Sequence, residues 1–276
     1  MKNRNALHQR KVHTVPMLLV LLFLPMMTHG NEVQNAYLFG VFPHVPKSKL
    51  YDMYAPVAAD FQKKLNKKVS VRTKSSYEAF ENALAEQIYD IALIQPFNYP
   101  DAHDKYNYLP LARRSDFLSA LVIVKKEAAF KTLTELKNRK IASTAKTAAV
   151  SRLIDMELRD MKFDPYKDFE RIFKNNHFSC LQTVLIGMAD ACVTSYRALD
   201  HYAQIKLQDR FRIIHESKKI PHVLYIVNKR VPKKDLKTLK YTILNWHLTQ
   251  AGKKILSQSR MSYFSEAKNE EYNILR

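Results

Sequence analysis

The chain has 276 residues, of which 46% are hydrophobic and 26% are charged. These proportions are typical of a globular protein with one large domain or two moderate ones, and they exclude a disordered, collagen-like or small disulfide-stapled chain. Lysine and arginine outnumber aspartate and glutamate by 45 to 26, which gives a net charge of +19. Because the sequence has only four glycines, a glycine-rich phosphate loop is disfavoured.

The N-terminus has the pattern of a secretion signal. Residues 1–11 carry basic side chains and no acidic one, and an apolar run follows at residues 15–27. This run is too short to span a bilayer comfortably but suits the hydrophobic part of a signal peptide. Small residues at Thr28 and Gly30 predict cleavage near Gly30, so we expect residues 1–30 to be a signal peptide and the protein to be periplasmic. An uncleaved N-terminal anchor is the alternative.

The positive charge bears on the choice of partner. Many of the lysines occur in scattered pairs such as Lys63-Lys64 and Lys125-Lys126, without interleaved aromatic residues. Export also argues against nucleic acid, so we expect no nucleic-acid partner. The charge is explained by a solvated cationic surface or by an anionic ligand.

The first part of the mature chain alternates strands and helices. An apolar strand is predicted at 36–42, and apolar residues spaced by three and four predict a helix over 50–65. A strand at 69–73, a helix capped by Ser75 or Ser76 and a buried strand at 89–94 follow. This order predicts a parallel sheet covered by helices.

A second α/β unit follows the first. Its strands are predicted at 118–125, 140–143, 169–173, 189–194 and 211–215, with helices at 133–138, 147–161, 179–186 and 196–205. A return strand is predicted at 223–227 and a helical tail at 233–260.

The fold class is therefore α/β with two lobes and two chain crossovers, near 115–119 and 217–222. Lobe 1 is predicted to comprise 31–117 plus 222–276, and lobe 2 to comprise 118–221. A cleft between two such lobes, where strand ends and helix N-termini converge, is a natural ligand site.

Motifs for catalysis are not found. The sequence has no G-x-S-x-G, P-loop, G-x-G-x-x-G or H-E-x-x-H, and its ten histidines show no metal-ligand spacing with carboxylates. We therefore expect no catalytic residue, no metal and no cofactor.

Cys180 and Cys192 are the only cysteines. In an oxidising compartment, a helix folding back onto its following strand would bring them within disulfide range. Two buried reduced thiols, or a thiol-based ligand or metal site with Cys180 near a helix N-terminus, are the alternatives.

Polar residues begin three of the predicted helices. They are Tyr77, Thr147 and His177, and the free N–H groups of a helix N-terminus favour an anion. Taken one at a time, Thr147 is better explained by simple capping, and the alternatives are core packing for Tyr77 and a partnered core or rim position for His177. All three are predicted to face the same cleft, which favours a ligand.

Several short segments of the chain form a recognisable series. They are 37–43, Tyr54-Ala55-Pro56-Val57, Ser76-Tyr77, Tyr89-Asp90-Ile91-Ala92, 177–191 and Ser217-Lys218-Lys219-Ile220-Pro221. In this order they resemble a known family, the periplasmic substrate-binding subunits of phosphate/phosphite/phosphonate ABC transporters. The resemblance covers roughly residues 36–250 and implies a type II periplasmic-binding-protein fold that closes on its ligand by a hinge.

The resemblance also implies roles for individual residues. Tyr77 matches a family tyrosine that contacts the bound anion, and His177 matches a pocket histidine. Thr147 lies in the segment that matches the family's Ser-Thr-Ser-Gly anion loop, where this chain reads Lys146-Thr147-Ala148-Ala149. With fewer hydroxyl donors, the pocket is expected to prefer a less charged or more apolar ligand than a phosphonate.

We expect a soluble, monomeric periplasmic binding protein that captures a small anion and delivers it to an ABC-transporter permease. Tyr77 and Thr147 would donate hydrogen bonds, His177 would donate or become charged, Gln95 would fix the orientation, and Phe97 would form an apolar wall. A ligand sensor for a histidine kinase or a diguanylate cyclase is the second hypothesis. A secreted enzyme is the third.

Overall fold

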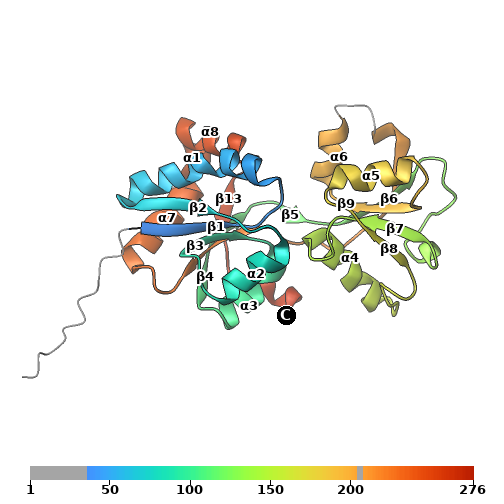
Figure 1. Ribbon diagram of the computed structural model, residues 1–276, viewed down its shortest axis with the longest axis horizontal. Helices are drawn as coiled ribbons and strands as arrows, with labels where there is room; N and C mark the ends of the chain where they lie inside the picture. Colours follow the sequence, from blue (N-terminus) through green and yellow to red (C-terminus); the bar gives the residue numbers. More distant parts are fainter. Residues whose placement is uncertain (1–35, 204–207) are drawn as a thin grey trace, which may run out of the picture. The chain divides into compact units, whose positions relative to one another are not determined.

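The structure, a computed structural model, describes residues 36–203 and 208–276 (Figure 1). The predicted signal peptide, with its cleavage site near Gly30, lies outside the described residues. The described residues form two main β-sheets with helices on both sides, which confirms the predicted α/β class. Within them, no helix is both long enough and apolar enough to cross a bilayer.

The first sheet has six strands in the order β13-β4-β12-β3-β1-β2. The strands are β1 (Ala36–Val41), β2 (Lys68–Arg72), β3 (Ile91–Ile94), β4 (Tyr108–Arg114), β12 (Leu224–Asn228) and β13 (Phe264–Glu266). As predicted from the alternation of strands and helices, β1 is parallel to both β2 and β3. The later strand β12 inserts antiparallel between β3 and β4.

Helices cover the first sheet on both sides. They are α1 (Lys47–Leu65), α2 (Tyr77–Ala85), α3 (Tyr99–Asp104), α7 (Lys233–Asn245) and α8 (Gln250–Gln258), with the 3-10 helices η1 (Pro96–Asn98), η4 (Trp246–Leu248) and η5 (Asn269–Leu275). The apolar spacing in α1 buries Leu50, Met53 and Phe61 against the sheet. In α2, the Ser76 hydroxyl accepts from the Ala79 N–H at 3.1 Å, which fixes where this helix begins.

The second sheet has five strands in the order β10-β6-β9-β7-β8. The strands are β6 (Leu121–Lys125), β7 (Lys140–Ser143), β8 (Glu170–Phe173), β9 (Ala191–Thr194) and β10 (Phe211–Glu216). Its helices are α4 (Ala149–Asp160), α5 (His177–Leu185) and α6 (Tyr196–Ala203), with the 3-10 helices η2 (Thr134–Leu136) and η3 (Gln208–Arg210).

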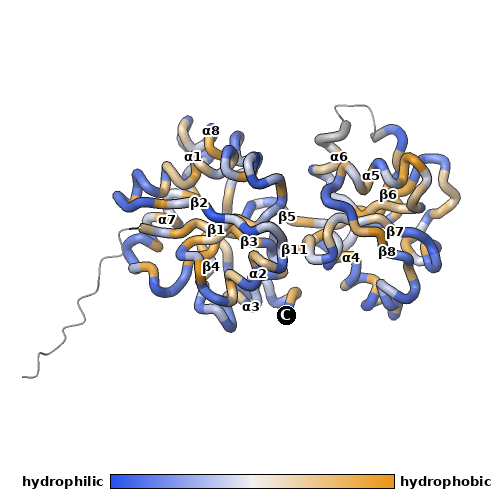
Figure 2. The backbone as a smooth tube through the Cα atoms, in the orientation of Figure 1, coloured by the Kyte–Doolittle hydropathy of each residue, from blue (hydrophilic) through white to orange (hydrophobic). Residues whose placement is uncertain are grey.

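Both faces of β6 are covered, which explains its continuous apolar sequence. Leu121 and Ile123 pack in one cluster with Leu181 of α5, whereas Val122 and Val124 pack in another with residues of α4. Figure 1 shows α4 on one side of this sheet and α5 and α6 on the other. Figure 2 shows hydrophobic residues along these strands and a mixture of hydrophobic and hydrophilic residues along the helices.

Two short strands join where the chain passes between the main sheets. β5 (Phe117–Leu118) pairs antiparallel with β11 (Ile220–Pro221). These strands lie at the two predicted crossovers. The lobe boundaries themselves, with 31–117 and 222–276 in one lobe and 118–221 in the other, stay a prediction.

Some predicted elements differ from the observed ones. The predicted strand 118–125 is interrupted at Ser119 and Ala120, and the predicted tail helix is split into α7 and α8 by η4. The split is fixed by Thr249, whose hydroxyl accepts from the Gly252 N–H at 3.0 Å and begins a new helix. The end of the predicted helix 196–205 lies outside the described residues.

Strand β4 was not predicted at all. Its sequence contains Pro110 and ends in two arginines, and neither feature is typical of a central strand. Both arginines are buried here because each has a carboxylate partner: Arg113 donates to Glu271 at 2.9 Å, and Arg114 pairs with Asp116. The strand is therefore stabilised by partners that lie outside it.

Candidate functional site

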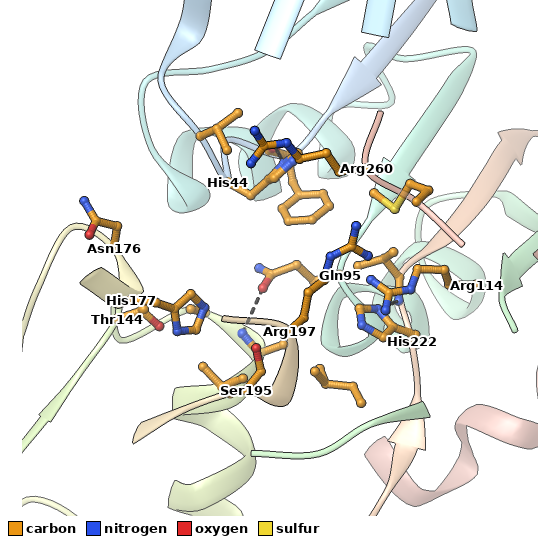
Figure 3. A pocket seen from close by; sticks show the side chains of 18 of the residues that line it. His44, Gln95, Arg114, Thr144, Asn176, His177, Ser195, Arg197, His222 and Arg260 are labelled. Atoms are coloured by element: carbon orange, nitrogen blue, oxygen red, sulfur yellow. Dashed lines mark hydrogen bonds between the residues drawn. The ribbon is translucent and has the colours of Figure 1, made fainter. Parts of the chain in front are cut away.

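A cavity of about 350 Å³ lies where loops from both sheets meet (Figure 3). From the first sheet it is lined by residues at or just after the ends of β1, β3 and β4, including Phe42, His44, Gln95, Arg114 and Asp116. From the second sheet it is lined by residues that follow β7, β8 and β9, including Thr144, Asn176, His177, Ser195 and Arg197. Strand ends and helix N-termini therefore converge on this inner cavity, as in other α/β ligand sites.

A second, more open cavity of about 1510 Å³ adjoins the inner one. The two share several lining residues, among them Tyr77, His177, Arg197 and Arg260. Lys49, Lys146 and Lys174 line the outer cavity, whose lining includes one carboxylate, that of Glu78. The approach to the inner cavity is therefore electropositive, which favours the entry of anions.

The structure brings together most of the predicted site residues. Tyr77, Gln95 and His177 line the inner cavity, and Thr147 lines the outer one. Phe97 is not among the residues that line either cavity. Its half-buried ring instead packs on the core of the second sheet, with the Arg152 guanidinium 4.7 Å from the ring centroid.

His177 is the first residue of α5, and its ring is held in place. Its Nδ1 lies 3.0 Å from the hydroxyl oxygen of Thr194, which is fully buried at the end of β9. Burial lowers the pKa of His177 to about 4, so the imidazole is neutral at pH 7. With Nδ1 engaged by Thr194, the other ring nitrogen is free to contact a ligand.

Tyr77 is the first residue of α2 and is half-buried. Its ring packs near Phe42, with centroids 6.2 Å apart. Burial raises the pKa of Tyr77 to about 12, which keeps the phenol protonated. A protonated phenol at the cavity wall can donate a hydrogen bond to an anion.

Gln95 makes hydrogen bonds to the start of α4, a role that the sequence did not indicate. Its side chain is buried, and its Oε1 accepts from the Ala149 N–H at 2.8 Å, shown as the dashed line in Figure 3. Its Nε2 also donates to the Thr147 carbonyl at 3.3 Å. Gln95 therefore caps the start of α4 from the first sheet and ties the end of β3 to this helix.

Sequence reasoning missed the three arginines that line the inner cavity. Arg114 ends β4, Arg197 lies in the first turn of α6, and Arg260 follows α8. Against them the inner cavity has one carboxylate, that of Asp116. The available signal for Arg197 was its place in the first turn of a helix that follows a buried strand.

The arginines shape the electrostatics of the inner cavity. Burial opposes ionisation of Asp116, but hydrogen bonds from Arg114 outweigh it and hold the pKa of that carboxyl below its usual value. Partial burial and the nearby charge of Arg114 lower the pKa of Arg197. An arginine nevertheless stays charged in proteins.

His222 is a neutral histidine at the same end of the cavity. Its Nδ1 accepts from the Val223 N–H at 2.7 Å, so its proton is on Nε2. Burial, together with the positive charge of Arg114, lowers the pKa of His222 to about 3. Figure 3 shows His222 beside Arg114 and Arg197, with His177 and Asn176 on the opposite side.

These two histidines predict that stability falls in mild acid. The pKa of His177 is about 4 and that of His222 about 3, whereas a histidine in the unfolded chain titrates near ~6.5. As the pH falls below ~6.5 the unfolded chain takes up protons that the folded protein does not, so stability present above this pH is progressively lost. The loss through His177 continues down to about pH 4, and that through His222 down to about pH 3.

Thermal unfolding of His222→Gln measured between pH 7.5 and pH 4.5 should show a smaller decrease in Tm than the wild type. An identical pH profile for His222→Gln and the wild type would contradict the assignment of His222 as a buried neutral imidazole.

Comparisons with known proteins agree with this arrangement. The family model described as "ABC transporter, phosphonate, periplasmic substrate-binding protein" matches residues 39–272. No curated protein matches the chain. Among the described residues, no group of three or more His, Cys, Asp or Glu side chains is placed to hold a metal ion.

Several solved structures share the fold. A binding protein component of an ABC phosphonate transporter from Pseudomonas aeruginosa is 15% identical, with 87% of this chain and 83% of that chain covered and a TM-score of 0.72. PhnD1 from Prochlorococcus marinus, in complex with methylphosphonate, is 16% identical, with 88% and 96% covered and a TM-score of 0.76.

A third structure, XAC2383 from Xanthomonas citri bound to ATP, is 12% identical, with 87% and 94% covered and a TM-score of 0.74. At such low identities these structures support the fold alone. The family model, by contrast, matches nearly the whole of the described chain. The resemblance found in the sequence is thus confirmed, and the chain belongs to the family of periplasmic substrate-binding proteins of phosphonate ABC transporters.

Proposed function

We propose that this protein captures a small organic anion in the periplasm, delivers it chemically unchanged to the permease of an ABC transporter, and catalyses no reaction. The observation that carries the proposal is the lining of the inner cavity, where Arg114, Arg197 and Arg260 face a single carboxylate, that of Asp116. A net positive, partly apolar cavity is suited to an organic anion.

In this proposal the lysines of the outer cavity attract the anion, and residues of both sheets then hold it. Tyr77 and His177 donate hydrogen bonds, Thr147 contributes from the outer cavity, and Gln95 keeps the α4 turn in place. Closure would use the paired β5 and β11 strands as a hinge, because both crossovers pass there.

The proposal includes further features of the mature protein. It is released by cleavage near Gly30, works as a monomer and does not bind nucleic acid. Its lobes comprise 31–117 with 222–276 and 118–221. A sensor role would use the same cavity but a different membrane partner, so co-purification of the permease distinguishes transport from sensing.

His177→Ala should weaken anion binding at least tenfold, because a hydrogen bond to a charged group contributes about 1.5–3 kcal/mol. Isothermal titration of the purified protein with phenylphosphonate and methylphosphonate measures this loss. His103→Ala, outside both cavities, is the matched control and should keep the wild-type affinity.

Two results would contradict the proposal in different ways. An unchanged isotherm for His177→Ala would remove this residue from the binding site. Conversion of the added phosphonate to a new compound, detected by phosphorus NMR, would show an enzyme instead of a carrier.

A further inference from the structure

We propose that the acid group of the ligand binds to the Arg197 and Arg260 side chains, backed by Arg114, and not to the N-terminus of α4. We also propose that the organic body of the ligand is apolar and larger than a methyl group. Both statements rest on the proposed function, because they identify the ligand class of the same cavity.

The N-terminus of α4 is already occupied by this chain's own residues. The Gln95 amide accepts from the Ala149 N–H and donates to the Thr147 carbonyl, at 2.8 and 3.3 Å. The N-cap residue is Ala148, which has no side-chain group to offer an anion. An anion bound at this turn would have to displace Gln95. Ala148 and Ala149 have no hydroxyl group that could hold the anion there.

Arg197 and Arg260, unlike the start of α4, are accessible to a ligand. Both side chains are exposed in the cavity walls, and both line the inner and the outer cavity. Among the described residues, no hydrogen bond or ion pair engages either guanidinium. The guanidinium of Arg114, by contrast, is paired with Asp116. Both guanidinium groups are therefore available to pair with the acid group of a ligand, and the carboxylate that acts on Arg197 from the same cavity, Asp116, is already paired with Arg114.

The three arginines also lie close enough to repel one another. The pKa of Arg197 is lowered by burial first, and then by the charges of Arg114 and Arg260, while the Asp116 carboxylate opposes this lowering. A bound anion would relieve this repulsion, because each guanidinium would then face an opposite charge. Figure 3 shows Arg114 and Arg197 at one end of the cavity, away from His177 and Thr144.

The rest of the cavity indicates an apolar ligand body. Apolar residues from both sheets line it, including Phe42, Met53, Phe117, Leu118, Val150 and Met261. Phe117 is 52% exposed, so its ring offers surface that a ligand can cover. The volume of about 350 Å³ corresponds to roughly ten water molecules at ~30 Å³ each, so inorganic phosphate or methylphosphonate would leave much of it unfilled.

Titration calorimetry of the purified protein with two probes tests the proposal. The probes are phenylphosphonate, which has an apolar ring, and methylphosphonate, which lacks the ring. Phenylphosphonate should bind at least tenfold more tightly than methylphosphonate.

The variants Arg197→Gln and Arg260→Gln should each weaken phenylphosphonate binding at least tenfold. Arg159→Gln is the matched control, because Arg159 is an exposed arginine of α4 that lines neither cavity, and it should change the affinity less than twofold. Gln95→Ala should not tighten methylphosphonate binding, because the freed α4 turn is not the anion site. Circular dichroism should show the folded spectrum for every variant.

The outcomes separate this inference from the proposed function. If Arg197→Gln and Arg260→Gln bind as Arg159→Gln does, if methylphosphonate binds as tightly as phenylphosphonate, or if Gln95→Ala tightens methylphosphonate, the inference is overturned while anion transport stands. If the wild-type protein binds neither probe, the proposed function is overturned with it.

Discussion

Asp155→Ala should lower the free energy of unfolding by about 3–5 kcal/mol, the usual cost of removing one partner from a buried ion pair. The Asp155 carboxylate on α4 accepts hydrogen bonds from the Arg171 guanidinium and the Tyr166 hydroxyl. The two charged side chains are almost fully buried, with 4% and 2% of their surfaces exposed. Removing the carboxylate leaves the charge of the Arg171 guanidinium buried without an oppositely charged partner and shielded from solvent.

The same helix provides a matched control. Asp160 pairs with Lys218, but these side chains are 63% and 37% exposed, so Asp160→Ala should change stability by no more than about 1 kcal/mol. Urea denaturation of the two variants measures both losses. Equal losses would contradict the view that burial of the Asp155 pair determines its contribution.

A double replacement separates the charge from the packing. Asp155→Leu with Arg171→Met should recover most of the stability, because no unpaired charge then remains buried. The pair also matters for the site, since α4 continues from the turn that Gln95 caps and that lines the inner cavity. Loss of Asp155 should therefore weaken anion binding under conditions where the variant is still folded.

Local patterns explain why most of the fold could be predicted. The spacing of Leu50, Met53, Val57 and Phe61 by three and four residues predicts a buried helix face, even though it does not show what covers that face. Strand β4 could not be found in this way. Its burial of Arg113 depends on Glu271, a residue 158 positions away in the sequence, and no local pattern carries that information.

The candidate site was predictable to the extent that helix starts are visible in the sequence. Tyr77 and His177 were identified because each begins a helix after a strand. The convergence of Arg114, Arg197 and Arg260 could not be predicted, because it depends on how β4, β9 and α8 end near one another. Fewer hydroxyls had indicated a less charged ligand, whereas the proposal that these arginines hold the acid group rests on the cavity lining.

The hydrogen bonds of the Gln95 side chain could not be predicted from the sequence either. Its position after β3 predicted a polar group in the cleft, and the structure places it there. Its hydrogen bonds, however, are made to the backbone of residues 147 and 149, which no sequence pattern connects to it. Pairing across two sheets is a property of the tertiary structure.

The second large effect is expected from the cysteines. A disulfide joins Cys180 of α5 to Cys192 of β9 across a sequence separation of 12, and both residues are fully buried. Constraining a loop of this length in the unfolded chain contributes about 3 kcal/mol in the loop-entropy model. The double variant Cys180→Ala with Cys192→Ala should lose about this much unfolding free energy.

The disulfide also helps to hold the binding site in place, because the two cysteines lie on α5 and β9, the two elements that position His177. His177 begins α5, and Thr194, which contacts its ring at 3.0 Å, lies two residues after Cys192. Urea denaturation should be easier for the wild-type protein with dithiothreitol than without it, and the double variant should be insensitive to the reductant. In intact-mass measurements on urea-unfolded protein, a thiol-alkylating reagent should give no adduct before reduction and two after it. Two adducts before reduction would show that the thiols are free, and the stability of the α5–β9 pair would then come from packing in the core alone.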